Sequence, residues 1–145
     1  MGSFEVLSHT ADVGFRARGG TLEDLFEISA EAMLSLEYDL SEASPSEEVG
    51  LQAQGEDLEE LLYGWLSELL WIHDAEEFVP AEVVVAEVVR PGPDGSEFIV
   101  RGSARGRRLG DWFRQTGPQL KAVTMHGLSV AEADGSYEAT VFLDV

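Results

Sequence analysis

The sequence predicts an α+β fold in which two helices pack on a mostly antiparallel β-sheet. Two segments carry apolar residues at helical spacing, while the other ordered segments alternate or are rich in β-branched residues. Their order is ββαβα followed by about five strands, and turn signals join several successive strands, which favours antiparallel pairing. With 145 residues, no internal repeat and no linker, residues 1–145 are expected to form a single compact domain.

The N-terminal part begins with two short strands. Residues 4–8 and 13–18 alternate between apolar and polar side chains, and Val13, Phe15 and Ala17 share one face. A polar turn, residues 9–12, separates them. Gly19 and Gly20 then end the second strand.

Two helices follow from apolar spacing and from residues that favour helix starts. Thr21 is a good N-cap with Asp24 three residues on, and helical spacing runs from Leu22 to Leu36. The second helix has a wide apolar stripe from Leu58 to Ile72. Acidic residues at its start, Glu56, Asp57, Glu59 and Glu60, lie where the helix dipole favours negative charge.

The remaining segments predict strands and loops. Residues 41–48 are expected to be a surface loop before a strand ending at Gly55. Strands are then expected over 82–90, 97–104, 121–124, 128–133 and 137–143. Residues 91–95 and Asp134-Gly135 are turn signals, and 105–116 is an irregular, basic stretch.

Charge is the most unusual feature of the composition. The chain has 28 acidic and 9 basic residues, for a formal net charge of −19. From Gly19 to Val89 there are 19 acidic residues and no Lys or Arg. A surface this acidic repels phosphate backbones, so no tight direct nucleic-acid binding is expected. It would suit a basic protein partner or cations; the alternative is that the helices simply carry solvated acidic faces, or that the host proteome is acid-biased.

The composition also limits the compartment and the type of site. The chain has no cysteine, which excludes disulfides and thiolate metal sites. The N-terminal sequence lacks the basic segment and apolar run of a signal peptide, and no apolar stretch reaches the roughly 20 residues of a membrane helix. We therefore expect a cytoplasmic protein without a membrane partner.

Several familiar catalytic motifs are absent from the sequence. It contains no GxxxxGK[ST], no GxGxxG after a strand, no GxSxG and no HExxH. Basic and aromatic residues are interleaved only at Arg108, Trp112, Phe113 and Arg114, which is a weak signal for RNA binding. We expect no catalytic residues and no enzymatic activity.

Two segments of the sequence carry carboxylate groups that could bind a metal ion. Asp12 ends the first turn, and the chain closes on Asp144 and the free carboxylate of Val145. If these groups meet, three carboxylates would repel one another unless a cation joined them, and hard oxygen ligands suit Ca²⁺ or Mg²⁺. Spacing alone leaves the alternative open: Asp12 then stabilises an Asx turn and Asp144 is a solvated chain end.

Two of the three histidines also allow two interpretations. His9 and His126 lie in loops or at strand ends, where they could serve as acid, base or ligand, although hydrogen-bonded structural roles are more frequent. His73 lies at the C-terminal end of the second helix, where a partly positive imidazole suits the helix dipole. It requires no functional role.

The same segments resemble the archease family. The likeness runs in one order from Phe4 to Val145, on five motifs: His9–Gly14, Thr21–Phe26, Gly55–Leu66, Lys121–His126 and Tyr137–Val145. Met125 departs from the family pattern, which usually has an aromatic residue there. The basic stretch from Gly102 to Gly117 also matches poorly.

The resemblance implies a function and a metal site. Archeases assist the RtcB-type RNA ligase in tRNA splicing and RNA repair, by promoting its guanylylation and turnover. The family pattern includes a divalent cation, calcium, whose ligands match Asp12, Asp144 and Val145 here. The family has also been suggested to be a chaperone-like modulator of tRNA methylation.

Three function classes are compatible with these residues. The favoured class is an accessory protein that docks on an RNA ligase. The second is a small metal-dependent hydrolase using Asp12, His9 and His126, which lacks an evident nucleophile. The third is a binding module for a tRNA-modifying methyltransferase, which differs from the first only in its partner. The sequence does not define the oligomeric state, the docking face, the metal bound in the cell, or whether residues 101–121 contact a partner.

Overall fold

Four strands, from the N-terminal and C-terminal parts of the chain, form one sheet. The computed structural model describes residues 2–8, 12–41, 44–108, 110 and 114–145. The sheet is antiparallel, in the order β1-β2-β9-β8, with β1 (Gly2–Ser8), β2 (Asp12–Gly19), β8 (Ala122–Ala133) and β9 (Ser136–Asp144). The two strands from opposite ends of the sequence, β2 and β9, are its central pair. Their alternation turns Phe15, Ala17, Val141 and Leu143 into the core, all 0% exposed.

Three further strands form a second antiparallel sheet. Its order is β4-β6-β5, with β4 (Glu47–Gly55), β5 (Phe78–Val89) and β6 (Phe98–Arg108). Two short strands, β3 (Tyr38–Asp39) and β7 (Arg114–Gln115), pair only with each other. Every described strand pairing is antiparallel, as the sequence predicts.

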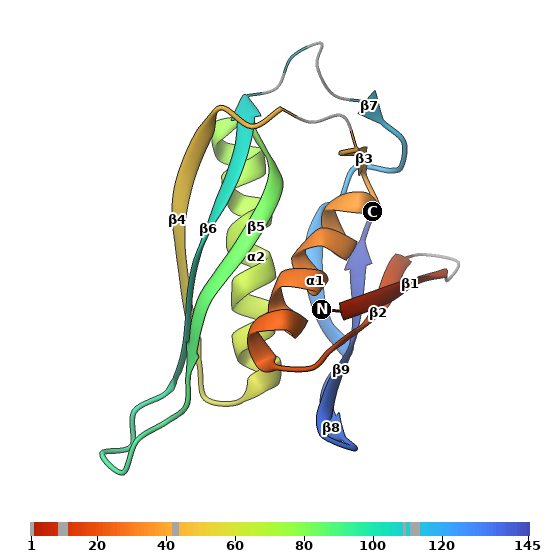
Figure 1. Cartoon of the computed structure of the whole chain (residues 1–145). Helices are drawn as coiled ribbons and strands as arrows, with labels where there is room; N and C mark the ends of the chain where they lie inside the picture. The colour runs from red at the N-terminus through yellow and green to blue at the C-terminus, as the bar shows by residue number, and fades with distance from the viewer. Residues whose placement is uncertain (1, 9–11, 42–43, 109, 111–113) are drawn as a thin grey trace.

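The two helices lie between these sheets (Figure 1). Helix α1 (Leu22–Ser35) begins after Thr21, whose Oγ1 accepts the Asp24 N–H at 3.0 Å. Helix α2 (Leu58–Glu76) begins after Asp57, whose carboxylate accepts the Glu60 N–H at 2.8 Å. Each cap satisfies a helix donor that otherwise has no partner. Among the described residues no helix is long and apolar enough to cross a membrane.

The core fills the space between the sheets with residues from both helices. Trp65 of α2 is 0% exposed, and its indole N–H donates to the Phe26 carbonyl of α1 at 3.2 Å. Opposite it, a Cβ on Gly102 of β6 would lie 3.0 Å from the Trp65 ring. Glycine is therefore needed at this position to let the indole approach the sheet.

The structure corrects two strand predictions. The strand predicted over 97–104 continues to Arg108 as β6, so Arg105, Arg107 and Arg108 lie on a strand rather than in an irregular stretch. The strands predicted over 121–124 and 128–133 are one strand, β8, with a register shift between Thr124 and Ser129. Gly127, inside that shift, has φ +74°, a conformation that favours glycine.

Helix glutamates cover part of one edge strand in each sheet. On α1, Glu27 accepts the Val85 N–H of edge strand β5 at 2.9 Å, and Glu23 accepts the Val88 N–H at 3.0 Å. On α2, Glu59 accepts the Val130 N–H of edge strand β8 at 3.1 Å. An edge strand with free N–H groups is a template for unwanted pairing. These carboxylates therefore tie each helix to a sheet and block its edge.

The edge contact of Glu27 predicts a loss of stability when it is removed. Glu27→Ala leaves the part-buried Val85 N–H without its acceptor, which should lower the free energy of unfolding by about 1 to 2 kcal/mol. Glu31→Ala, on the same helix but exposed, should change it by less than about 0.5 kcal/mol. Urea denaturation of both variants measures the difference. Equal losses would show that the edge contact contributes nothing.

Candidate functional site

The two predicted acidic ligands are direct cross-strand neighbours. In the register of β2 and β9, Asp12 lies opposite Asp144. Residues directly opposite in an antiparallel pair have Cβ atoms about 5 Å apart on the same face of the sheet. Their neighbours Val13 and Leu143 belong to the core side, so both carboxylates are on the outer face. Asp12 is half-buried, while Asp144 and the following Val145 are exposed.

The backbone at this end of β9 is held from both sides. Asp144 pairs with Asp12 of β2 and with Ala122 of β8, and its carbonyl accepts the Lys121 N–H at 2.9 Å. A terminal residue without such bonds would be expected to fray. The chain end therefore has a fixed backbone position beside Asp12.

An aromatic ring lies next to the carboxylate pair on the same face. Phe142 occupies the position between two glycines: an added Cβ would lie 2.6 Å from its ring at Gly14 and 3.1 Å at Gly127. Asp12, His126, Gly127 and Phe142 line a small cavity of about 170 Å³. The small residues on β2 and β8 thus let the ring lie flat against the sheet and form a wall beside Asp12.

The oxygen donors where β2 begins and β9 ends suit a hard cation. Among the described residues no three Asp, Glu, His or Cys side chains gather into a metal-binding group. The side chains of Asp12 and Asp144 therefore supply two donors, and a third would come from the terminal carboxylate of Val145. Carboxylate oxygens alone are the ligand type that Ca²⁺ and Mg²⁺ prefer. The residues present fit such an ion.

One other candidate residue, His126, lies at the border of this set. His126 is exposed and borders the cavity with Asp12. His9, Thr10 and Ala11 lie outside the described residues, as do Trp112 and Phe113 of the interleaved basic and aromatic segment. The structure therefore brings together Asp12, Asp144 and Val145 at one chain end and adds His126 at its border.

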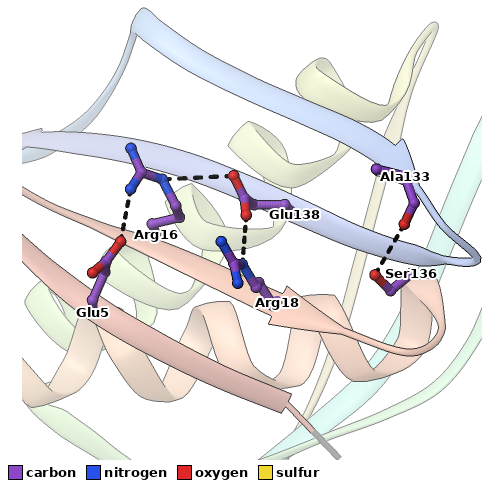
Figure 2. A network of polar contacts seen from close by, with 6 residues as sticks. All are labelled: Glu5, Arg16, Arg18, Ala133, Ser136 and Glu138. Atoms are coloured by element: carbon purple, nitrogen blue, oxygen red, sulfur yellow. Dashed lines mark hydrogen bonds and ion pairs between the residues drawn. The ribbon is translucent and has the colours of Figure 1, made fainter.

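Further along the same face, the basic residues of β2 are already paired (Figure 2). Arg16 contacts Glu5 at 2.7 Å and Glu138 at 3.6 Å, and Arg18 contacts the same Glu138 at 2.5 Å. In the part of the chain that the structure describes, no Lys or Arg forms an ion pair with Asp12 or Asp144. The carboxylate pair is therefore not neutralised by the basic residues on its own face.

The basic residues of β6 do not form a basic patch. Arg101 contacts Glu87 at 3.7 Å, and Arg105 contacts Glu82 at 3.4 Å, both on β5. On the other side, Arg105 lies opposite Glu48 of β4. The positive charges of this strand are thus interleaved with glutamates on its neighbours. A polyanion would meet acidic side chains on both sides of them.

A buried polar cluster that sequence reasoning missed joins the ends of the two helices. His73 of α2 is 5% exposed and Glu37, just after α1, is 3% exposed. Their side chains approach to 3.6 Å, and the His73 Nε2 lies 2.8 Å from the Tyr38 hydroxyl. The His73 Nδ1–H donates to the Phe78 carbonyl at 3.1 Å. His73 lies in the last turn of α2, as predicted, and is in addition part of a buried hydrogen-bonded cluster.

This cluster also positions the segment that leads to the chain end. The Glu37 carboxylate accepts the Leu120 N–H at 3.0 Å, and its backbone carbonyl accepts the Thr116 and Gly117 N–H groups. Burial, followed by the hydrogen bond to Glu37, raises the pKa of Tyr38 well above its ordinary value, so the phenol stays protonated as a donor. Since Lys121 bonds to Asp144, Glu37 is linked through Leu120 to the end of β9.

The like-charge pair predicts an effect of charge removal in the absence of a cation. With chelator present, Asp12→Asn should raise the free energy of unfolding by about 0.5 kcal/mol, because it removes repulsion between directly opposed carboxylates. Glu68→Gln, in the middle of α2, removes the same net charge and serves as the control. Chemical denaturation in chelator measures both. Equal changes would mean that only the overall charge of the chain matters.

The chain is similar to known proteins over nearly its whole length. A model of the archease protein family (MTH1598/TM1083) matches residues 4–145. The chain is 33% identical over 146 residues to the protein archease of Pyrococcus furiosus, covering 100% of each. It is 36% identical over 142 residues to that of Archaeoglobus fulgidus, covering 98% of each.

Two solved structures share the fold. The solution structure of Methanobacterium thermoautotrophicum protein 1598 is 34% identical, with a TM-score of 0.81 and 98% of each chain covered. The crystal structure of an archease described as a possible chaperone, from Thermotoga maritima, is 21% identical with a TM-score of 0.62, covering 96% of this chain and 94% of that one. The family match and the identities over the full length lead to one conclusion: the chain belongs to the archease family.

Proposed function

We propose that this protein is an accessory activator of an RtcB-type RNA ligase in tRNA splicing and RNA repair. In this role it promotes guanylylation and turnover of the ligase and carries a divalent cation, with calcium as the expected ion. The observation that supports the proposal most is the register of β2 and β9, which sets Asp12 directly opposite Asp144 beside the chain end. These are the positions that the family resemblance implies as ligands.

In this proposal the chain's own residues build and hold the cation site. Asp12 and Asp144 would each supply a side-chain oxygen, and Val145 would supply its terminal carboxylate. The hydrogen bond from Lys121 to Asp144 and the wall formed by Phe142 would fix the donors before the ion arrives. When bound, the cation would polarise phosphate oxygens placed against it during nucleotidyl transfer on the ligase.

The proposed activity lies in the ligase and not in this chain. The sequence lacks a phosphate-binding loop and a recognisable nucleophile. The basic residues of β6 lie beside glutamates on the neighbouring strand β5. Neither feature favours catalysis on RNA or tight binding to it. The net charge of −19 would instead steer the protein towards a basic surface around the ligase nucleotide site.

A chaperone-like modulator of a tRNA methyltransferase is the second candidate. The Thermotoga maritima relative is described as a possible chaperone, which is the observation that favours it. In both proposed functions this protein docks on a partner enzyme and catalyses no reaction itself. They differ in the partner that copurifies with the chain, so a pull-down from host lysate separates them.

The ligase proposal predicts a gain in multiple-turnover joining. Substoichiometric amounts of the protein, added to the cognate ligase with GTP and divalent cation, should increase the amount of RNA joined per ligase. Asp12→Ala should lose most of this gain, because the remaining carboxylates cannot replace the missing ligand. Arg18→Ala, which alters only the ion-pair network on the same face, should retain it. The readout is joined RNA on a denaturing gel.

Two results would count against the proposal. Ligation that stays flat at every concentration of the protein, while a tRNA methyltransferase is stimulated, would favour the second candidate. Joining or nucleotide hydrolysis by the purified protein alone would contradict the accessory role altogether.

A further inference from the structure

A cavity lies away from the Asp12–Asp144 pair. It has a volume of about 720 Å³ and lies where the C-terminal half of α1, strand β3 and the first half of β5 meet. We call it the α1–β5 groove. Its apolar lining includes Leu34, Leu40 and Val83, and its acidic lining consists of Glu27, Glu31, Asp39 and Glu82. A cavity of this size can accommodate several side chains of a ligand.

One wall of the groove is an uncovered strand edge. Strand β5 is at the edge of its sheet, and Glu27 accepts the Val85 N–H from outside the sheet. Backbone groups alternate along an antiparallel strand, so the N–H and C=O of Val83 point the same way as the Val85 N–H. In the described part of the chain, the α1 carboxylates bond to the Val85 and Val88 N–H groups and not to that of Val83. The edge is thus covered by α1 from Val85 onward and open at Val83.

The charge in the groove has one sign. No Lys or Arg lines it, while four carboxylates do. Three of them are engaged: Glu27 with Val85, Asp39 with Ser41, and Glu82 with Arg105. Glu31 is exposed on α1 and forms no ion pair with a described residue. It offers a negative charge in the same groove as the open strand edge.

These features select an extended, basic ligand. An added strand would bond its backbone to Val83, and its side chains would point alternately to the two sides of the new strand. One set would meet the carboxylates and the other Leu34, Leu40 and Val83. We propose that the α1–β5 groove binds a segment of a partner protein with alternating basic and apolar residues, as an added strand on β5. This inference does not depend on which protein the chain serves.

The test uses a defined peptide and two charge-matched variants. A fluorescein-labelled peptide of eight residues, alternating lysine and valine, is titrated with the full-length protein by fluorescence anisotropy. Glu31→Arg should weaken binding by about fivefold or more, since it reverses a charge at the groove. Glu68→Arg, in the middle of α2, changes the net charge equally and should alter binding by less than about twofold. Circular dichroism checks that both variants remain folded.

A second peptide distinguishes strand addition from simple charge attraction. Replacing each valine by proline keeps the lysines but removes backbone N–H donors that an added strand requires. This peptide should bind at least about tenfold more weakly. In the wild-type complex, hydrogen exchange at the Val83 amide should slow, because the peptide carbonyl then accepts its N–H.

Several outcomes would overturn the proposal. No saturable binding of the lysine–valine peptide would do so directly. Equal weakening by Glu31→Arg and Glu68→Arg would assign any binding to the overall acidity of the chain. Equal affinity for the proline peptide, or displacement of the bound peptide by an equimolar amount of spermine, would indicate a cation site without strand addition.

Discussion

The pairing of β2 with β9 places two carboxylates directly opposite each other, and much of the molecule is arranged around that pairing. The two strands come from opposite ends of the sequence and form the centre of one sheet, with Phe15 and Val141 in the core beneath them. Their outer face carries Asp12 and Asp144. Directly opposed like charges destabilise a sheet, and a positive charge placed between them would remove that cost. No described Lys or Arg pairs with them, and a bound cation would fill this role.

The acidic composition has a second structural use. Glu23, Glu27, Glu37 and Glu59 each accept a backbone N–H from a strand edge or loop. A carboxylate has several acceptor sites and reaches further than a backbone carbonyl, so it can connect a helix to the edge of a sheet. The acidic helix faces are therefore not only solvated surfaces. They hold the helices between the sheets and leave one stretch of β5 uncovered at the α1–β5 groove.

The sequence predicted the local elements better than their connections. The helix starts at Leu22 and Leu58 follow from N-caps and apolar spacing, and the Asp134-Gly135 turn follows from residues that tolerate positive φ, here 54° and 77°. The end of β6 was missed because residues 105–108 consist of three arginines and the buried Gly106, which give no apolar alternation. Two sheets instead of one could not be predicted, since strand partners far apart in sequence leave no local pattern. For the same reason the Glu37–Tyr38–His73 cluster was invisible, whereas the approach of Asp12 to Asp144 was anticipated only through the family resemblance.

We propose that Asp12, Asp144 and the Val145 carboxylate share one divalent cation. The most direct measurement is anomalous diffraction from crystals of the full-length protein grown with manganese chloride, recorded at the manganese absorption edge. A shared cation should give one strong peak per chain, within about 2.6 Å of carboxylate oxygens from both aspartates, and calcium chloride added in excess should remove that peak. A map without a peak between these residues, with the two side chains turned apart into solvent, would contradict it.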